Sequence, residues 1–382
     1  MKKPQQPLVG TRNSSIELLK IFAILLVVIS HVLQTLHEPN EYFANNDYLL
    51  DLSMATTNAQ QLILALLRYS GALGNTIFFA CSAWFLLDSE KANKKKLLRM
   101  LLDVWVISVL ILIVVLILRG GSIGIKLMLK QLLPVTFDTN WYVTCYLVFY
   151  PVHPFLNWLI KKMDQRTLLK TTLVLLLLYV FANFMLANRF HFSSLILWVT
   201  LYFAIAYMKF YLPDLSSDPR RNRLLLAVGV LGNIALVLLT NLLGLRFEAF
   251  SDKLLHWNTN CNPFLILTAI SLLNLTRNTH FHSKAVNYIS GLSLLIYVIH
   301  ENQLLRIFYR PLLWELVYTR FGYKFVLLWA FVLVVAVFSF GLIAAIVYKS
   351  TLQKAVAALC NRLYPMAQKL YRKLEQRILR LQ

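Results

Sequence analysis

Apolar runs of about 20 residues recur along the chain, and short polar or basic segments separate them. Runs of this length suit α-helices that cross the hydrocarbon core of a bilayer. The pattern predicts about ten spans, near residues 16–36, 70–88, 100–118, 141–160, 168–187, 193–212, 224–243, 262–276, 288–305 and 325–348. Because backbone polar groups in lipid must be paired internally, we expect an all-α, polytopic integral membrane protein.

Composition and charge agree with this class of protein. Of the 382 residues, 58% are hydrophobic and 14% are charged, which excludes an ordinary soluble domain. The formal net charge of +21 could indicate nucleic-acid binding, but the basic residues lie between the apolar runs. With the N-terminus inside, the inner segments hold 26 Lys and Arg residues and the outer segments hold 11. This asymmetry predicts that both termini are cytoplasmic and that nucleic acid is not a partner.

Three regions follow from this topology: a cytoplasmic segment over 1–15, a ten-helix membrane domain over 16–348 and a basic tail over 349–382. In the tail, apolar residues recur every three or four positions with Lys and Arg between them. We expect an amphipathic helix, interrupted at Pro365, that lies on the anionic membrane lipid of the inner leaflet. A coiled-coil seam is the alternative, although the tail holds fewer than three clean heptads.

The polar loops and the cysteines add two expectations. The loop from His37 to Tyr69 contains four acidic residues, and the charge count places it outside the cell. The four cysteines include no Cys-x-x-Cys pair, so we expect neither a disulfide framework nor a metal site.

The first predicted span carries ionisable residues on one face. Eleven helical steps separate Lys20 from His31, which brings the two side chains within about 20° of each other around the helix axis. Glu17 lies near the same face, and the rise from Lys20 to His31 is about 16 Å. Ionisable groups inside a span are costly and often functional. The structural alternatives are a core histidine bonded to a neighbouring helix and a lysine that reaches the membrane surface.

The ninth predicted span carries a second set of polar residues. They recur at spacings of three and four along an otherwise apolar helix: Asn287, Ser290, Ser293, Tyr297, His300 and Glu301. His300 lies about 18 Å from the inner end, a depth similar to that of His31. We therefore expect two imidazoles and a carboxylate to meet in the outer half of the membrane. A structural His–Glu pair that holds helices together is the alternative.

Two further stretches allow both a functional and an ordinary interpretation. The basic run Lys94–Arg99 is typical of a cytoplasmic loop, but clustered cations also bind phosphate oxygens. Asn140, Trp141 and Tyr142 lie at the predicted outer end of the fourth span. Aromatic side chains at that position suit either a sugar ring or the lipid interface.

Four motifs in this order resemble membrane acyltransferase family 3, whose members O-acylate extracytoplasmic glycans. They are Lys20 followed by His31 after ten residues, Phe78-Phe-Ala-Cys-Ser-Ala-Trp-Phe85, Lys96-Leu-Leu-Arg99 and Tyr297-Val-Ile-His300. The resemblance covers Arg12 to Tyr348. This chain has Lys20 where the family more often has arginine, and Ala83-Trp84 where the family has Gly-Tyr. The lysine offers phosphate a point charge rather than a bidentate guanidinium.

The resemblance implies transfer of an acyl group, most simply acetyl from cytoplasmic acetyl-CoA, to a hydroxyl of a cell-surface or lipid-linked saccharide. Acetyl-CoA would be a substrate, with no tightly bound cofactor, and the enzyme would be a multi-pass protein of the cell (inner or plasma) membrane. The roles implied are donor binding by Lys20, Lys96 and Arg99, catalysis by His31, His300 and Glu301, and acceptor contacts by Trp141, Tyr142 and Tyr297.

A sugar hydroxyl is a poor nucleophile at neutral pH, and a neutral imidazole is a suitable general base. His31 is therefore expected to act as general base or as an acyl relay. A proton-coupled transporter or flippase of a lipid-linked saccharide is the alternative, because carriers also hold ionisable groups within their spans. Carriers often contain internal repeats, and this chain shows no duplication.

Overall fold

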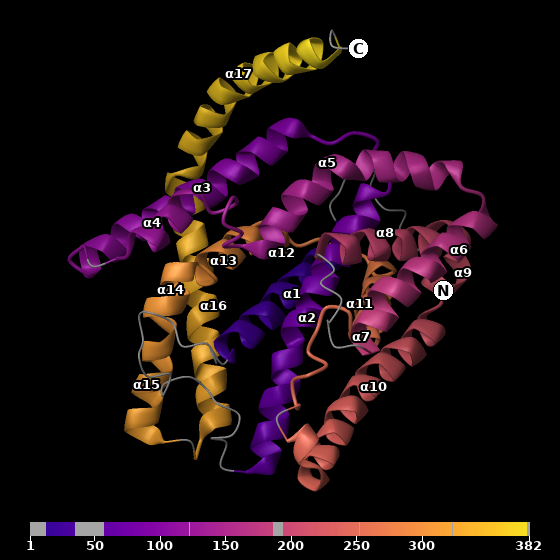
Figure 1. Ribbon diagram of the computed structural model, residues 1–382, viewed down its shortest axis with the longest axis vertical. Coiled ribbons are helices and arrows are strands. Elements are labelled where there is room, and N and C mark those ends of the chain that lie inside the picture. The colour runs from indigo at the N-terminus through magenta and orange to yellow at the C-terminus, as the bar shows by residue number, and fades with distance from the viewer. Residues whose placement is uncertain are drawn as a thin grey trace.

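The computed structural model describes residues 13–34, 57–121, 123–185, 194–251, 253–322 and 324–379. Within these ranges every regular element is a helix (Figure 1). The expected N-terminal segment, apart from residues 13–15, and the acidic part of the loop between the first two spans lie outside the described residues.

Eight helical segments are long and apolar enough to cross a membrane. They are α1 (Ser14–Val32), α2 (Asn58–Leu86), α3 (Lys94–Leu118), α5 (Trp141–Lys162), the segment Gln165–Met185, α8 (Ser194–Tyr211), α10 (Pro219–Arg246) and α16 (Val326–Thr351). A shorter apolar helix, α11 (Pro263–Arg277), stands where the eighth span was predicted. The expectation of an all-α, multi-pass membrane protein is therefore confirmed, whereas the number ten and the cytoplasmic termini stay predictions.

The shorter elements complete the chain. Gln165–Met185 contains α6 (Gln165–Leu175), a π-helical stretch (Leu176–Ala182) and α7 (Asn183–Met185). The others are α4 (Ile125–Leu132), α9 (Pro213–Ser217), a 3₁₀ turn (Glu248–Phe250), α12 (Lys284–Ser290), α13 (Ser293–His300), α14 (Gln303–Phe308), α15 (Arg310–Phe321) and α17 (Gln353–Leu379).

The prediction of one continuous helix over 288–305 is wrong. The chain there forms α12, α13 and α14, with interruptions after Ser290 and after His300. Asn302 causes the second interruption, because its side chain accepts a hydrogen bond from the Leu304 N–H and so caps a new helix. Glu301 therefore lies at the C-terminal end of α13, where the backbone turns away.

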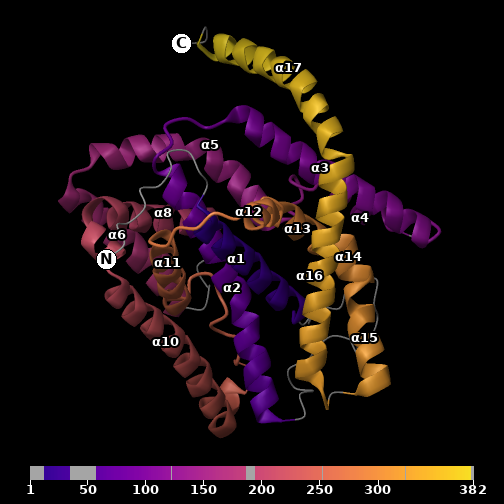
Figure 2. The ribbon, with the colours of Figure 1, turned by 180° about the vertical axis from the view of Figure 1, so that it is seen from behind.

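The prediction that Pro365 interrupts the tail is also wrong. Helix α17 runs through Pro365, and both views show it as a bent extension beyond α16 (Figures 1 and 2). Proline removes one backbone N–H donor, which accounts for a bend without requiring a break. The tail packs on the start of α3, where the Cys360 thiol lies 3.7 Å from the Lys95 carbonyl and the Lys94 ammonium lies 4.2 Å from the Tyr371 ring. Its contact with lipid stays a prediction.

Helix α1 occupies the centre of the helix assembly, in contact with α2, α11, α12, α13 and α16 (Figures 1 and 2). The approach to α2 is close because glycines face it. A Cβ atom added at Gly74 would lie 2.5 Å from the Ala23 carbonyl oxygen, and one added at Gly71 would lie 2.5 Å from Ser30 Oγ. Small residues allow backbones in membranes to approach in this way. The packing fixes the position of α1, including its last turn.

Gly74→Ala should therefore destabilise the protein, because the backbone of α1 cannot yield as a flexible side chain could. We expect a cost of about 1–3 kcal/mol, the usual range for overpacking. The measurement is thermal unfolding of the detergent-purified protein. The control Ala336→Val enlarges an exposed residue of α16 and should leave the melting temperature nearly unchanged. Equal melting temperatures for both variants would contradict the close contact of α1 with α2.

Candidate active site

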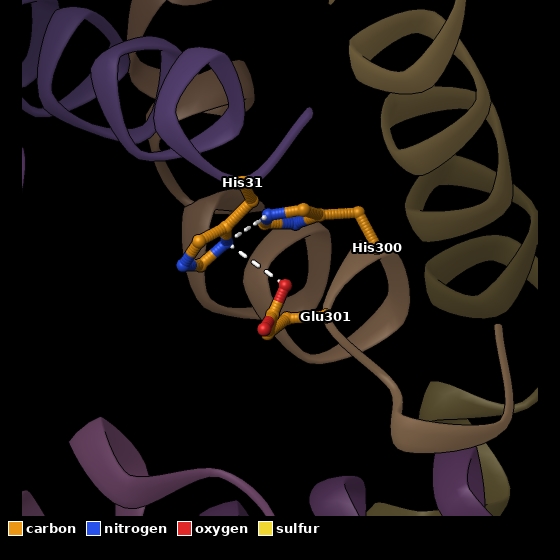
Figure 3. Close-up of side chains that lie close together, drawn as sticks. All are labelled: His31, His300 and Glu301. Carbon is orange, nitrogen blue, oxygen red and sulfur yellow. Dashed lines mark hydrogen bonds and ion pairs between the residues drawn. The ribbon is translucent and has the colours of Figure 1, made fainter. Parts of the chain in front are cut away.

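Two imidazoles and a carboxylate meet where the last turn of α1 faces the end of α13 (Figure 3). His31 Nδ1 lies 3.0 Å from His300 Nε2 and 3.0 Å from Glu301 Oε2. His300 is 3% exposed and the side chain of Glu301 is 8% exposed, whereas the side chain of His31 is 15% exposed. His31 is thus the member of the group that a reactant can reach most readily.

The hydrogen bonds fix which nitrogen of each ring carries a proton. His300 Nδ1 lies 2.7 Å from the Ile296 carbonyl, which can only accept, so Nδ1 is the donor. Nε2 of a neutral His300 is then an acceptor, as is Glu301. His31 Nδ1 faces both acceptors and must carry the proton, which leaves the lone pair of a neutral His31 on Nε2. In Figure 3 this second nitrogen points away from both partners.

Arginine side chains hold Glu301 in place. Arg310 Nη2 donates to Glu301 Oε2 at 2.9 Å and to the His300 carbonyl at 2.9 Å. Arg306 Nη1 donates to Glu301 Oε1 at 3.3 Å. Both guanidinium groups favour the ionised carboxylate and fix its rotamer. A fixed carboxylate can in turn orient His31 and stabilise the imidazolium that forms when His31 accepts a proton.

A third guanidinium belongs to the same region. Arg68 of α2 donates to the carbonyl of Ser30 at 3.0 Å and to its hydroxyl at 2.9 Å, directly before His31. Arg68 therefore contacts the turn of α1 that carries His31, while Arg306 and Arg310 contact Glu301.

The aromatic residues named from the sequence lie on the adjacent side of His31. The ring centroid of Tyr297 is 6.4 Å from that of His31 and 6.0 Å from that of His300. Tyr142 is buried, with its ring centroid 6.0 Å from that of Tyr297, and Trp141 packs on Tyr142 at 5.5 Å. The structure thus brings Tyr297 and Tyr142 together beside the histidines. Tyr142 belongs to the interior, whereas Trp141 is half-buried.

The other end of α1 is anchored and lines a cleft. Ser290 donates its hydroxyl to Glu17 Oε2, and the Lys20 ammonium lies 3.3 Å from Glu17 Oε1. Lys20 also lies 5.7 Å from the ring centroid of Phe85. A cleft of about 360 Å³ opens here, lined by Asn13, Ile16, Glu17, Trp84, Phe85, Arg277, Asn278 and His280. Lys20 is not itself among the lining residues but contacts two of them, Glu17 and Phe85, at the opposite end of α1 from His31.

Lys96 and Arg99 do not line this cleft. The Lys96 ammonium lies 5.8 Å from the ring centroid of Tyr150. Arg99 donates to the carbonyl of Gln353 at 2.8 Å and lies 3.8 Å from Asp103. The structure thus joins the Lys96-x-x-Arg99 region to the start of the tail helix. Donor binding by these two residues stays a prediction.

Comparison with known families gives the class of protein. The model of acyltransferase family 3, described as an acyltransferase domain, matches residues 13–348. The chain belongs to this family. No curated protein and no solved structure gave a match. Membership makes this a membrane acyltransferase and confirms the resemblance inferred from the four motifs.

His31, His300 and Glu301 also have the residue types of a metal site. One ligand atom from each lies within 4.8 Å of the others, which is close enough for a shared ion. The charges do not suit a cation, because both oxygens of Glu301 already accept hydrogen bonds from guanidinium groups. A metal ion would have to displace these bonds and stand beside positive charges. The donor set therefore fits proton transfer better than metal binding.

Sequence reasoning missed the cations that organise the acyltransferase site. From the sequence, Arg68, Arg306 and Arg310 were recognised only as three of the 11 Lys and Arg residues in the outer segments. A spacing of four places Arg306 and Arg310 on one helical face, which is a usable signal, but nothing local connects Arg68 with them. Arg277, which stacks 4.2 Å from the ring of Trp84 at the cleft, was read only as a topology signal.

Proposed function

We propose that this acyltransferase, in the cell membrane, transfers acetyl from cytoplasmic acetyl-CoA to a hydroxyl of a saccharide on the opposite side. The observation that carries the proposal is the contact of His31 Nδ1 with two acceptors, Glu301 Oε2 and His300 Nε2. Glu301 and His300 hold the Nδ1 proton, so the Nε2 lone pair is available to a reactant. A carboxylate-oriented imidazole of this kind is the usual general base for activating a hydroxyl.

The reaction balances with these groups. His31 Nε2 takes the proton of the saccharide hydroxyl while the oxygen attacks the thioester carbonyl. The tetrahedral intermediate collapses, the C–S bond breaks, and the thiolate of CoA receives the proton from His31. The products are an O-acetyl ester and free CoA. Glu301 remains ionised and stabilises the transient imidazolium, while His300 keeps Nδ1 of His31 oriented.

Tyr297 is the proposed donor to the oxyanion. Its hydroxyl is buried and donates no hydrogen bond to a described residue, although its ring lies beside His31. A buried donor without an acceptor lowers the stability of the fold, unless a bound ligand accepts its hydrogen bond. Tyr142, which packs on Tyr297, and Trp141 are proposed to shape the site around the reacting groups.

Helix α1 runs from the cleft to His31. The cleft lies beside Glu17, and the rise from Glu17 to His31 is about 21 Å. A small cavity of about 20 Å³ lies between them, with Ile24 and Val27 of α1 in its wall. Residues 17, 20, 24, 27 and 31 follow helical spacing along one face of α1. We propose that CoA phosphates bind near Lys20 and that the pantetheine arm follows this face.

Acetyl-CoA should therefore raise the melting temperature of the purified protein, and Lys20→Gln should weaken its binding about tenfold. This loss corresponds to about 1.4 kcal/mol, a reasonable value for one partly buried cation at a phosphate. The control Lys170→Gln changes an exposed lysine of α6 and should bind acetyl-CoA normally. No response of the unmodified protein to acetyl-CoA would refute the proposed donor and favour a saccharide carrier.

A further inference from the structure

A large apolar groove opens on the lateral face formed by α3, α14 and α16. Its volume is about 590 Å³, and its lining includes Val114, Leu118, Leu305, Tyr309, Ala344 and Val347. Leu118 is 67% exposed and Val347 is 54% exposed, so the lateral groove is open to its surroundings. In a membrane these surroundings are hydrocarbon. A volume of this size is typical of a ligand site rather than a packing defect.

Three residues that line the lateral groove are chain neighbours of candidate site residues. Ile299, which also lines it, directly precedes His300. On the α14 side, Leu305 and Tyr309 line the groove, while their neighbours Arg306 and Arg310 contact Glu301. The same short segment therefore offers an apolar surface in one direction and guanidinium groups in another.

The cations at this junction have unused hydrogen-bonding capacity. Arg310 is 6% exposed, and its Nη1 has no partner within the described part of the chain. Gln131 Nε2 is likewise buried and unpartnered there, while its Oε1 accepts from Asn302, the neighbour of Glu301. Arg306 and Arg310 place two guanidinium charges against the single carboxylate of Glu301, and Arg68 adds a third cation beside His31, where it donates to the Ser30 carbonyl. Buried donors with excess positive charge point to an anionic ligand.

We propose that the acceptor is a lipid-linked saccharide, in which a glycan is joined through phosphate to a long hydrocarbon chain. The chain would occupy the lateral groove, the phosphate would bind at Arg306 and its neighbouring guanidinium groups, and the glycan would present a hydroxyl to His31. This inference rests on the proposed acetyl transfer and names its acceptor class. A water-soluble polysaccharide would not need the groove, and an ordinary surrounding lipid would not need the buried cations.

The test measures binding without any acyl donor. The purified protein is placed in phosphatidylcholine nanodiscs, and binding of geranylgeranyl diphosphate is measured by native mass spectrometry. Geranylgeraniol and inorganic diphosphate serve as probes that carry only the tail or only the charge. We expect geranylgeranyl diphosphate to bind at least tenfold more tightly than either. Equal binding of phosphatidylglycerol would show a general anionic-lipid surface and would overturn the proposal.

Two matched pairs of variants locate the site. Ala344→Phe fills the lateral groove, while Ala336→Phe makes the same change at an exposed position of α16 outside its lining. Arg306→Gln removes one cation, while Arg320→Gln removes an exposed cation of α15. The first member of each pair should weaken binding of geranylgeranyl diphosphate about tenfold, and the second should not. Equal losses within a pair would refute the site.

A separate readout distinguishes this proposal from the proposed function. The melting-temperature response to acetyl-CoA should survive Ala344→Phe, since the donor cleft lies at the other end of α1. Should Ala344→Phe instead change the preference among acyl-CoA chain lengths and spare the diphosphate probe, the groove would belong to the donor and the proposal would be wrong. If the unmodified protein did not respond to acetyl-CoA, the proposed donor would be refuted. The measured binding of geranylgeranyl diphosphate would still stand.

Discussion

His31→Ala should abolish acetyl transfer while leaving the protein in the membrane. Among the described residues of this site, only His31 has one ring nitrogen held by acceptors and the other directed away from them. Its Nδ1 contacts Glu301 and His300, and its Nε2 carries the lone pair. General-base catalysis by a positioned side chain accelerates a reaction by about 10²–10⁴-fold, so the rate of acetyl transfer should fall by at least that factor. Surface glycans from cells with the gene intact, deleted or carrying His31→Ala can be compared by NMR. The O-acetyl signal should disappear in both altered strains.

The matched control is His282→Ala, which removes an exposed imidazole near the other end of α1 and should leave the signal intact. Purified His31→Ala should still respond to acetyl-CoA in thermal unfolding, because the proposed phosphate site is remote. Continued O-acetylation in the His31→Ala strain would disprove the assignment of His31 as base or relay. Disappearance of the whole glycan on deletion would point instead to a flippase.

Helical periodicity was sufficient to predict which residues of α1 share a face. Lys20 and His31 share a face because the helix between them is unbroken, and this condition holds in the structure. The same reasoning also anticipated that His300 and Glu301 would approach His31. It succeeded there although the predicted continuous helix is wrong, because the two residues are adjacent and the break falls directly after them.

The first break, at Gly291, falls within a mostly apolar stretch and could not be read from hydrophobicity. The second break coincides with the polar run from His300 to Gln303, and Asn302 caps the new helix by accepting from the Leu304 N–H, so this position did carry a sequence signal. The approach of Arg68 to the last turn of α1 depends on the packing of α2 on α1, which no local pattern encodes. The lateral groove likewise depends on the crossing of α3 and α16. Sequence reasoning therefore found the catalytic candidates but not the cationic and apolar surfaces around them.

Glu301→Gln should reduce the rate of acetyl transfer by up to about 10⁴-fold, the loss seen when the carboxylate of a carboxylate–imidazole pair is neutralised. The amide retains the size of the side chain but no longer stabilises an imidazolium. The His31 tautomer with its proton on Nδ1 then depends mainly on His300 Nε2 as acceptor. The change should appear in kcat rather than in KM for acetyl-CoA. Single-turnover rates at saturating donor measure it directly.

Stability separates this role from a purely structural one. Glu301→Gln leaves Arg310 buried without its anion, and breaking a buried pair in this way costs about 3–5 kcal/mol. Glu301→Asp keeps the charge and should recover most of the melting temperature. Its shorter side chain should recover only part of the rate, since the carboxylate cannot reach both Arg310 and His31 at their present distances of 2.9 and 3.0 Å. If Glu301→Gln lowered the melting temperature but kept kcat within about threefold, Glu301 would only hold the helices together. The base would then act without an orienting carboxylate.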